Sequence, residues 1–283
     1  MPNPDAGRPA DGVLPRSEVV SRLRAAGCVF AEQEAELLCS AAGGAAELAD
    51  LLQRRVAGLP LEHLLGHAHF AGRRVVVRPG VFVPRRRTEL PATRALELAG
   101  QAGQHPVVVE LCCGAAAVAA VVAAGAPHAL VHAADIDDAA VRCARENLPG
   151  GHVHRGDLYA ALPDGLRGRI DVLVANAPYV PTERIATMPP EAREHEPRGA
   201  LDGGADGLSV QRRVVAGAPE WLAPGGHLLI ETSRHQAPRT AECCTAHGLH
   251  PSIEQCDELD ATMVLGRAQA ASARSHRTRL RWP

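Results

Sequence analysis

The first quarter of the chain shows the 3.6-residue spacing of apolar positions that is typical of amphipathic helices. Val19 and Leu23 fall on one face of a segment that Ser17 could cap and that Gly27 would end. Segments 31–42 and 48–56 show the same spacing and also end at glycine. We therefore predict a small helical domain over residues 14–69, preceded by a disordered stretch, 1–13.

The pattern changes to consecutive β-branched residues after this domain. The runs 75–77 and 81–83 are both rich in valine, and they flank Arg78–Pro79–Gly80. Proline and glycine at such a position are typical of a turn between strands. We predict a hairpin that turns at 78–80 within a linker, 70–90, followed by a helix over 88–98.

Strand and helix patterns alternate through the rest of the chain. Repeated β-α-β units predict an α/β domain with a mostly parallel, seven-stranded sheet covered on both faces, over residues 91–267. A tail over 268–283, which is basic, is expected to be disordered. The expected strands are 107–111, 130–135, 152–156, 171–176 and 227–232, with two more near 253 and 262–266, and the expected helices are 115–124, 138–147, 208–222 and 236–247.

Composition and charge exclude several classes of function. All 30 basic residues are arginine, so a mechanism that needs lysine, such as a Schiff base or a P-loop, is excluded. A net charge of −2 argues against stable nucleic-acid binding, which needs a basic face. No apolar run approaches the ~20 residues of a membrane helix, and no secretory signal is visible at the start. The eight cysteines form no C-x-x-C pair, so we expect reduced thiols, a cytoplasmic location and no metal site.

Three successive strands of the predicted sheet end in an acidic residue. Glu110, Asp135 and Asp157 each close a strand, and Gly114 lies in the turn after the first of them. Ligands of open α/β sheets bind beyond these carboxyl ends. Asp135 is placed to accept hydrogen bonds from ribose hydroxyls, and Asp157 to meet the edge of an adenine. The alternative is that each aspartate only marks a turn.

The fourth strand ends in Asn176-Ala177-Pro178-Tyr179, in a chain with only three asparagines and two tyrosines. An Asn-x-x-Tyr pattern is expected by chance about 0.02 times in such a chain. The Asn176 side-chain oxygen and the Ala177 carbonyl can together accept both N–H bonds of one NH₂ group, and Tyr179 offers a flat face. This arrangement suits methyl transfer to a planar nitrogen, whereas the alternative is an ordinary Asx–Pro turn.

With these residues the sequence resembles the protein N(5)-glutamine methyltransferases that modify peptide chain release factors. The resemblance also rests on segments 60–66, 82–89, 196–201 and 203–208, and it covers about residues 15–267. It implies a class I S-adenosylmethionine-dependent methyltransferase with a Rossmann-like sheet and a helical domain that recognises the substrate. We also expect the protein to be a monomer. The protein substrate would be a release factor, methylated at its Gly-Gly-Gln glutamine.

The resemblance also assigns roles to particular residues. It implies catalysis by Asn176, Ala177, Pro178 and Tyr179, with Asn176, Tyr179 and Glu196 binding the substrate. The residues that it implies for binding S-adenosylmethionine are Glu110, Cys112, Gly114, Ala116, Asp135, Asp157, Leu158 and Asn176.

Three positions depart from the family pattern. Ala177 stands where the family has proline, and Cys112 and Ala116 stand where it usually has glycine. A side chain at either loop position is strained if the backbone there needs a positive φ. Three rival functions therefore stay open: a DNA adenine-amino methyltransferase, a non-catalytic protein-binding paralogue with an eroded cofactor loop, and, more distantly, a dehydrogenase.

Overall fold

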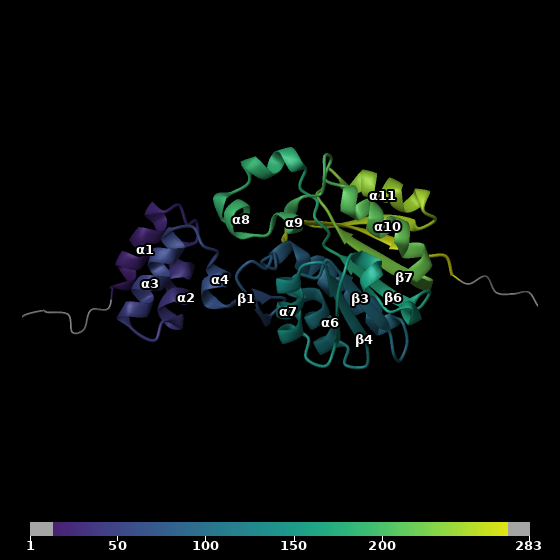
Figure 1. The fold of residues 1–283 in the computed structure, drawn as a ribbon, viewed down its shortest axis with the longest axis horizontal. Helices are drawn as coiled ribbons and strands as arrows, with labels where there is room; N and C mark the ends of the chain where they lie inside the picture. The colour runs from purple at the N-terminus through teal and green to yellow at the C-terminus, as the bar shows by residue number, and fades with distance from the viewer. Residues whose placement is uncertain (1–13, 271–283) are drawn as a thin grey trace, which may run out of the picture.

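The computed structural model describes residues 14–270, and the expected disorder of 1–13 and of most of the tail lies outside this range. The described part begins with a helical bundle, seen at one end of the molecule in Figure 1. Its helices are α1 (Arg16–Ala25), α2 (Ala31–Ala41), α3 (Ala45–Val56) and the short α4 (Leu61–Leu65). They enclose a small core of their own that includes Val19, Leu23 and Leu38.

Two details of this region differ from the prediction. Ser17 does not cap α1, because the helix starts at Arg16 and the Pro15 carbonyl accepts its first backbone bonds. The hairpin consists of β1 (His67–Phe70) and β2 (Arg73–Val76), so it turns at Ala71–Gly72 and not at 78–80. Both turn residues have positive φ, as a two-residue type I′ turn requires, and alanine at the first position hid that turn from the sequence pattern.

The second domain is built on the predicted seven-stranded sheet, which is therefore confirmed. The strand order is β5-β4-β3-β6-β7-β9-β8, and only β9 runs antiparallel to its neighbours. The strands are β3 (Val107–Leu111), β4 (Leu130–Asp135), β5 (His152–Arg155), β6 (Ile170–Ala175), β7 (Leu222–Glu231), β8 (His250–Cys256) and β9 (Ala261–Arg267). The carboxyl ends of β3 to β7 thus meet along one edge, as the acidic residues at strand ends had suggested.

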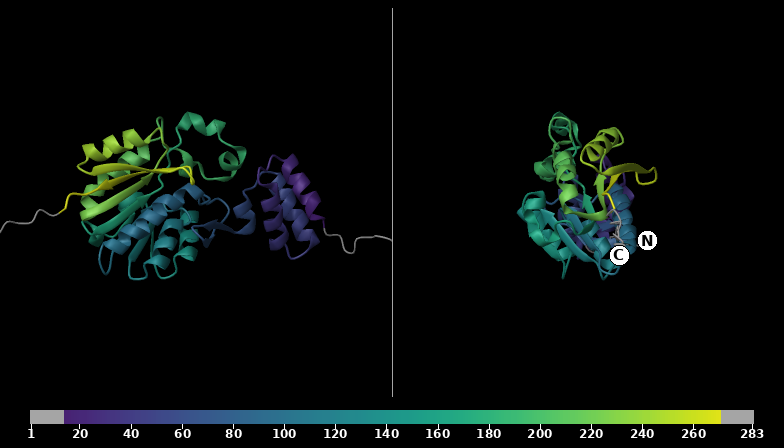
Figure 2. Two further views of the ribbon diagram at one scale, coloured as in Figure 1. Left: turned by 180° about the vertical axis from the view of Figure 1, so that it is seen from behind. Right: turned by 90° about the vertical axis from the view of Figure 1, so that its right-hand side faces the viewer.

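Helices cover both faces of the sheet, as Figures 1 and 2 show. One face packs against α5 (Glu89–Gln101), α6 (Ala117–Gly125) and α7 (Asp138–Asn147). The other face packs against α10 (Ser209–Trp221) and α11 (Ala237–Ala246), where Trp221 is buried. Alternate residues of each strand enter the two cores, so that Val108 faces α6 while Val109 faces the opposite layer.

The segment between β6 and α10 belongs to the sheet domain and contacts the helical bundle. It contains the 3-10 helix η4 (Thr182–Thr187) and the short helices α8 (Pro190–His195) and α9 (Arg198–Leu201). Arg55 of α3 is buried and donates to Glu34 within the bundle and to Glu191 of α8, with Arg55 Nη1 2.9 Å from Glu191 Oε2. The bundle is therefore attached to the segment that leads into the sheet domain. Within residues 14–270, no helix has the length and apolar character that crossing a membrane demands.

Candidate active site

A cavity of about 600 Å³ opens at the carboxyl ends of β3, β4, β5 and β6. It is lined by every residue that the sequence assigned to the site except Ala116. Because those residues come from five separate stretches of chain, their convergence is a property of the fold. The lining residues among them are Glu110, Cys112, Gly114, Asp135, Asp157, Leu158, Asn176, Ala177, Pro178, Tyr179 and Glu196.

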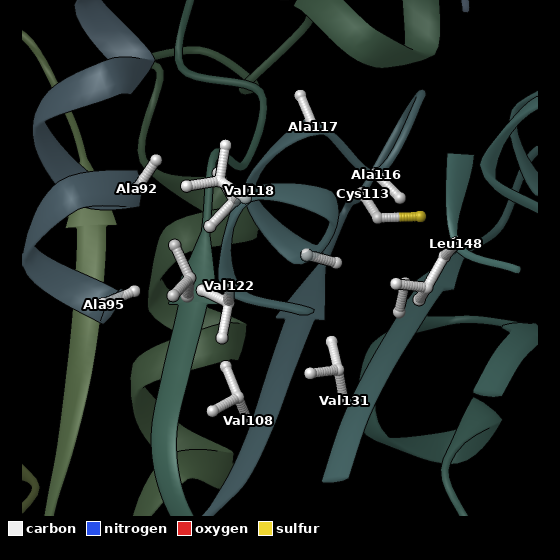
Figure 3. Close-up of a cluster of buried hydrophobic side chains, with 14 of the residues drawn as sticks. Ala92, Ala95, Val108, Cys113, Ala116, Ala117, Val118, Val122, Val131 and Leu148 are labelled. Atoms are coloured by element: carbon white, nitrogen blue, oxygen red, sulfur yellow. The ribbon is translucent and has the colours of Figure 1, made fainter. Parts of the chain in front are cut away.

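Ala116 is the one residue assigned to cofactor binding that does not line the cavity. Its backbone has φ of +57° and forms the N-terminal boundary of α6. Its methyl group is fully buried among the apolar residues of the α6 side of the sheet, close to Cys113 (Figure 3). The left-handed conformation of the chain at this point turns the side chain into the core.

The loop after β3 does adopt the backbone that the missing glycines would favour. Cys112 has φ of +53° and Gly114 also +53°, and Leu158, which also lines the cavity, has +49°. A residue with a side chain pays a steric penalty of roughly 1–2 kcal/mol in this region of φ and ψ. The strain anticipated for Cys112 is therefore present, and burial raises the pKa of its thiol, which keeps it protonated.

Glu110 closes the N-terminus of α6. Its Oε2 atom accepts a hydrogen bond of 2.7 Å from the Ala119 amide. Burial raises the pKa of this carboxyl group to about 8, against the opposing effect of the backbone amides. A helix N-terminus is the usual place for the phosphate of a dinucleotide. Because a carboxyl group already fills that place, the cavity suits a nucleoside cofactor without phosphate.

Asp135 and Asp157 both line the cavity. Asp135 receives the amides of Gly114 and Asp137, one on each oxygen, at 2.9 Å in both cases. Each oxygen keeps a further lone pair, and burial raises the pKa of the group. Asp157 instead forms an ion pair with Arg213 of α10, whose Nη2 lies 2.6 Å from Asp157 Oδ2. Both carboxylates can still accept hydrogen bonds from a ligand in the cavity.

The turn after β6 presents an amide to the cavity. Asn176 Nδ2 donates to Thr88 Oγ1 at 3.2 Å, which leaves the Asn176 oxygen free to accept from a ligand. Ala177 is fully buried, so the alanine in place of proline packs into the sheet domain without exposing the turn. The Tyr179 hydroxyl donates to Glu231 at 3.3 Å, and the ring lines the cavity.

A glycine-rich loop, residues 203–207, packs against the backbone of the turn that follows β6. Gly203 donates to the Val180 carbonyl at 2.9 Å, and a Cβ atom on Gly203 would lie 2.7 Å from the Pro178 oxygen. Gly207 approaches the Tyr179 carbonyl even more closely and has φ of +75°. No side chain fits at either position. The loop therefore fixes the turn through backbone contacts that only glycine permits.

Glu196 also lines the cavity. Its side chain is buried, and Oε1 accepts from the Val83 amide at 3.1 Å and from Arg85 Nη2 at 2.6 Å. Burial raises the pKa of Glu196, although Arg85 acts in the opposite direction. The other oxygen, Oε2, is buried without a partner in the described part of the chain. That atom is available to a donor on a ligand.

Sequence reasoning missed three residues of the site: Arg213, Thr88 and Glu231. Arg213 and Thr88 line the cavity, as does Arg87, and the Glu231 carboxylate accepts a hydrogen bond from the Tyr179 hydroxyl. Glu231 is an acidic residue at the end of a strand, as Asp135 is, so the same sequence pattern could have identified it. Between residues 14 and 270, no group of three histidine, cysteine or acidic side chains could hold a metal.

Comparisons with known proteins agree with this geometry. Residues 73–189 match the family model described as a methyltransferase small domain. A release factor glutamine methyltransferase of Streptomyces coelicolor is 37% identical over 190 residues, covering 64% of this chain and 66% of its own. The chain thus spans slightly less than two thirds of that relative.

Three further comparisons extend the match. The release factor glutamine methyltransferase of Bradyrhizobium diazoefficiens is 34% identical over 83% of this chain and 86% of its own. A 4-amino-L-phenylalanine/4-methylamino-L-phenylalanine methyltransferase of Streptomyces pristinaespiralis is 39% identical over 65% of each chain. A methyltransferase structure from Pyrococcus furiosus superimposes with a TM-score of 0.52 at 15% identity, covering 70% of this chain and 90% of that one. The predicted class I methyltransferase fold is therefore confirmed.

Proposed function

The chain belongs to the family of release factor glutamine methyltransferases, and from this premise we propose that it methylates the side-chain amide of a glutamine in a protein. The methyl donor is S-adenosylmethionine, and the protein substrate is a peptide chain release factor with its Gly-Gly-Gln loop. One observation carries the proposal: the Asn176 amide lies at the cavity with its nitrogen held by Thr88 and its oxygen free.

The residues around the cavity fit S-adenosylmethionine. Asp135 supplies acceptors for ribose hydroxyl groups, and Asp157 supplies one for the adenine amino group. Glu110 occupies the N-terminus of α6, where a phosphate-bearing cofactor would need open amides. This arrangement disfavours the dehydrogenase alternative. When bound, S-adenosylmethionine supplies an electrophilic methyl group.

The protein's own residues bind and orient the glutamine. Asn176 Oδ1 and the Ala177 carbonyl accept the two N–H bonds of the substrate amide, which directs its nitrogen lone pair into the cavity. Tyr179 packs against the amide plane. Orientation of this kind can lower a barrier by up to ~7–11 kcal/mol, and the chain needs no strong base because the proton leaves after the new N–C bond has formed. Glu196 binds the peptide side of the substrate.

The proposal also includes location and assembly. All eight cysteines are free thiols, which supports a cytoplasmic enzyme. We propose that it acts as a monomer without stable nucleic-acid binding, and that the helical bundle recognises the release factor.

A second candidate function is methylation of a small aromatic amine. The relative from Streptomyces pristinaespiralis, named for 4-amino-L-phenylalanine, is as similar to this chain as the release factor enzymes are. An arylamine also offers one NH₂ group that Asn176 and Ala177 can accept. The helical bundle and its contact with α8 favour a protein substrate over a small amine.

The test uses labelled S-adenosylmethionine with the full chain and three acceptors: a release factor, an adenine-containing DNA oligonucleotide, and 4-amino-L-phenylalanine. We expect one methyl group on the glutamine of the Gly-Gly-Gln loop, located by mass spectrometry. A release factor with glutamate in place of that glutamine is the control. Label on the DNA or on the amino acid alone would contradict the proposal. Calorimetry that detects no cofactor binding would instead support the non-catalytic paralogue.

A further inference from the structure

Asn147 is the last residue of α7, and its side chain bridges two segments that are distant in the sequence. Its Oδ1 atom accepts from the Val76 amide at 2.7 Å, and its Nδ2 atom donates to the Val76 carbonyl at 2.8 Å. The same Nδ2 atom donates to the Ala115 carbonyl at 2.9 Å. Val76 is the last residue of β2 in the hairpin, whereas Ala115 lies in the loop after β3, residues 112–116. Asn147 therefore joins the hairpin to this loop.

The partners of Asn147 determine which way round its amide lies. A backbone N–H can only donate, so the Val76 amide must meet the oxygen of Asn147. A carbonyl group can only accept, so the Val76 and Ala115 carbonyls must meet its NH₂ group. The three contacts agree with one another, and turning the amide over would oppose like groups at all of them. The Asn147 side chain is consequently held in one orientation.

The first half of the loop after β3 is bound to β4. The Cys113 amide donates to the Ala134 carbonyl at 3.1 Å, and the Gly114 amide donates to Asp135 Oδ2 at 2.9 Å. These contacts continue the pairing of the two strands beyond the end of β3. They hold the loop only as far as Gly114.

The second half of the loop contains the peptide group between Ala115 and Ala116. Its carbonyl is the one that Asn147 binds, and its N–H donates to the Cys113 carbonyl at 2.7 Å. A peptide group is planar, so a partner at each end fixes the direction of the whole plane. Asn147 supplies one of these two partners.

The direction of this plane sets the φ of Ala116, which is +57°. A positive φ is unfavourable for alanine, so rotating the plane until φ becomes negative would relieve the strain. The same rotation would turn the Ala115 carbonyl away from Asn147. The hydrogen bond from Asn147 therefore opposes the relaxation that the Ala116 side chain favours. Because Ala115 lines the cavity, the rotation would also reshape the cavity wall.

We propose that Asn147 is a positioning residue that keeps the loop after β3 in the form that binds S-adenosylmethionine. Asn147 is not among the residues that line the cavity, so it acts through the Ala115 carbonyl. The inference rests on the proposed placement of the cofactor in this cavity, and it does not depend on which molecule accepts the methyl group. The apparent affinity falls in proportion to the fraction of molecules that hold the binding form.

The first test measures the binding of S-adenosylmethionine by calorimetry, with no methyl acceptor present. We expect Asn147→Ala to raise the dissociation constant about tenfold, because the strained loop then relaxes in most molecules. Glu146→Gln is the matched control. Glu146 is the neighbouring residue and also binds the hairpin side, but both of its hydrogen bonds go to the exposed Arg78. It should change the dissociation constant less than about twofold. Equal effects of the two substitutions, or no effect of Asn147→Ala, would overturn the proposal.

The second test asks whether Asn147 acts by opposing the strain at Ala116. Glycine adopts a positive φ without strain, so in Ala116→Gly the peptide plane gains nothing by rotating. In a chain that already carries Ala116→Gly, we expect Asn147→Ala to raise the dissociation constant only about twofold. A residue that merely supports the fold would cause the same loss in both backgrounds. A full tenfold loss in the glycine background would therefore contradict the proposal.

The third test needs no cofactor, so it separates this inference from the proposed function. It follows amide hydrogen exchange in the free protein by NMR. We expect Asn147→Ala to speed exchange of the Ala116 amide about fivefold, because the plane that holds it loses one partner. Glu146→Gln should leave that rate unchanged. Asn147→Asp keeps the shape of asparagine but places an acceptor against both carbonyl groups, so it should act as alanine does and replaces it if alanine prevents folding. Unchanged exchange in the Asn147 variants would overturn the proposal even if the wild-type protein binds S-adenosylmethionine.

Discussion

Arg213 of α10 pairs with Asp157 at the cavity, with 2.6 Å between Arg213 Nη2 and Asp157 Oδ2. Both side chains are about half exposed, so the pair itself contributes little to stability, typically about 0–1 kcal/mol. Its importance is geometric, because Arg213 leaves Asp157 Oδ1 free to accept from a ligand. The pair joins the sheet edge to the helix on the far side of the cavity.

We expect Asp157→Ala to weaken the affinity for S-adenosylmethionine about tenfold or more. Losing a hydrogen bond to a charged acceptor costs about 1.5–3 kcal/mol, and 1.4 kcal/mol corresponds to a factor of ten. Isothermal titration calorimetry measures the change. Asp164→Ala is the matched control, because Asp164 also pairs with an arginine but lies outside the cavity lining. Equal effects of the two substitutions would contradict the assignment of Asp157.

A second prediction concerns the positive φ at Ala116. Glycine there removes a conformational penalty of about 1–2 kcal/mol. It also loses about 0.8 kcal/mol of methyl burial and a few tenths to 1 kcal/mol through the more flexible unfolded chain. We expect Ala116→Gly to change the free energy of unfolding by close to zero, measured by urea denaturation.

Ala119→Gly is the control for this substitution. Ala119 is equally buried but lies inside α6 with ordinary helical geometry. Glycine in a helix costs about 1 kcal/mol, and the lost methyl group adds about 0.8 kcal/mol. Ala119→Gly should therefore destabilise the protein by about 2 kcal/mol. If Ala116→Gly costs as much, the backbone at 116 is not strained.

The sequence located the parts of the site that follow directly from strand ends. Glu110, Asp135 and Asn176 each close a hydrophobic strand, and parallel strands bring their carboxyl ends together whatever the details of packing. Arg213 could not be found in this way, because it lies on a helix and its direction depends on how α10 packs. Thr88 is similarly distant, since its contact with Asn176 joins residues 88 positions apart.

The sequence pattern also could not predict which residues with side chains have a positive φ. Glycine normally signals a left-handed residue, whereas Ala71, Cys112 and Ala116 adopt that conformation with side chains. Non-glycine residues in this conformation account for both the misplaced hairpin turn, at Ala71, and the unusual cofactor loop, at Cys112 and Ala116. At Ala71 the tertiary structure overrides the local preference, and the strand pairing of β1 with β2 supplies the compensation.

A third prediction tests the loop behind the catalytic turn. A Cβ atom on Gly203 would lie 2.7 Å from the Pro178 oxygen and 2.6 Å from the Gly207 oxygen, so Gly203→Ala must displace one of these backbones. We expect a fall in kcat of about 100-fold, because a shift of about 1 Å at the reacting groups has that effect. Gly165→Ala, where a Cβ atom meets nothing within 4 Å, should leave kcat unchanged. Full activity in Gly203→Ala would mean that the loop does not hold the turn.

The last prediction concerns three histidines at the β4–β5 edge of the sheet. His132 stacks against His152 and His154, and its Nδ1 atom lies 2.9 Å from His154 Nε2. Burial, reinforced by the two neighbouring rings, lowers the pKa of His132 from 6.5 to about 4. The unfolded chain therefore binds a proton at a higher pH than the folded chain does. Stability from the neutral ring is present above pH 6.5 and is lost as the pH falls from 6.5 toward 4.

His132→Phe keeps a flat ring that cannot titrate. We expect the wild-type protein to lose up to about 2 kcal/mol more stability than His132→Phe between pH 7 and pH 5, because each unit of pKa shift corresponds to 1.36 kcal/mol. Urea unfolding at the two pH values measures this difference. Replacing the exposed His105, which lies outside the stack, controls for the general effect of losing an imidazole. Parallel pH dependence in the wild type and His132→Phe would show that the buried ring is not the source of acid sensitivity.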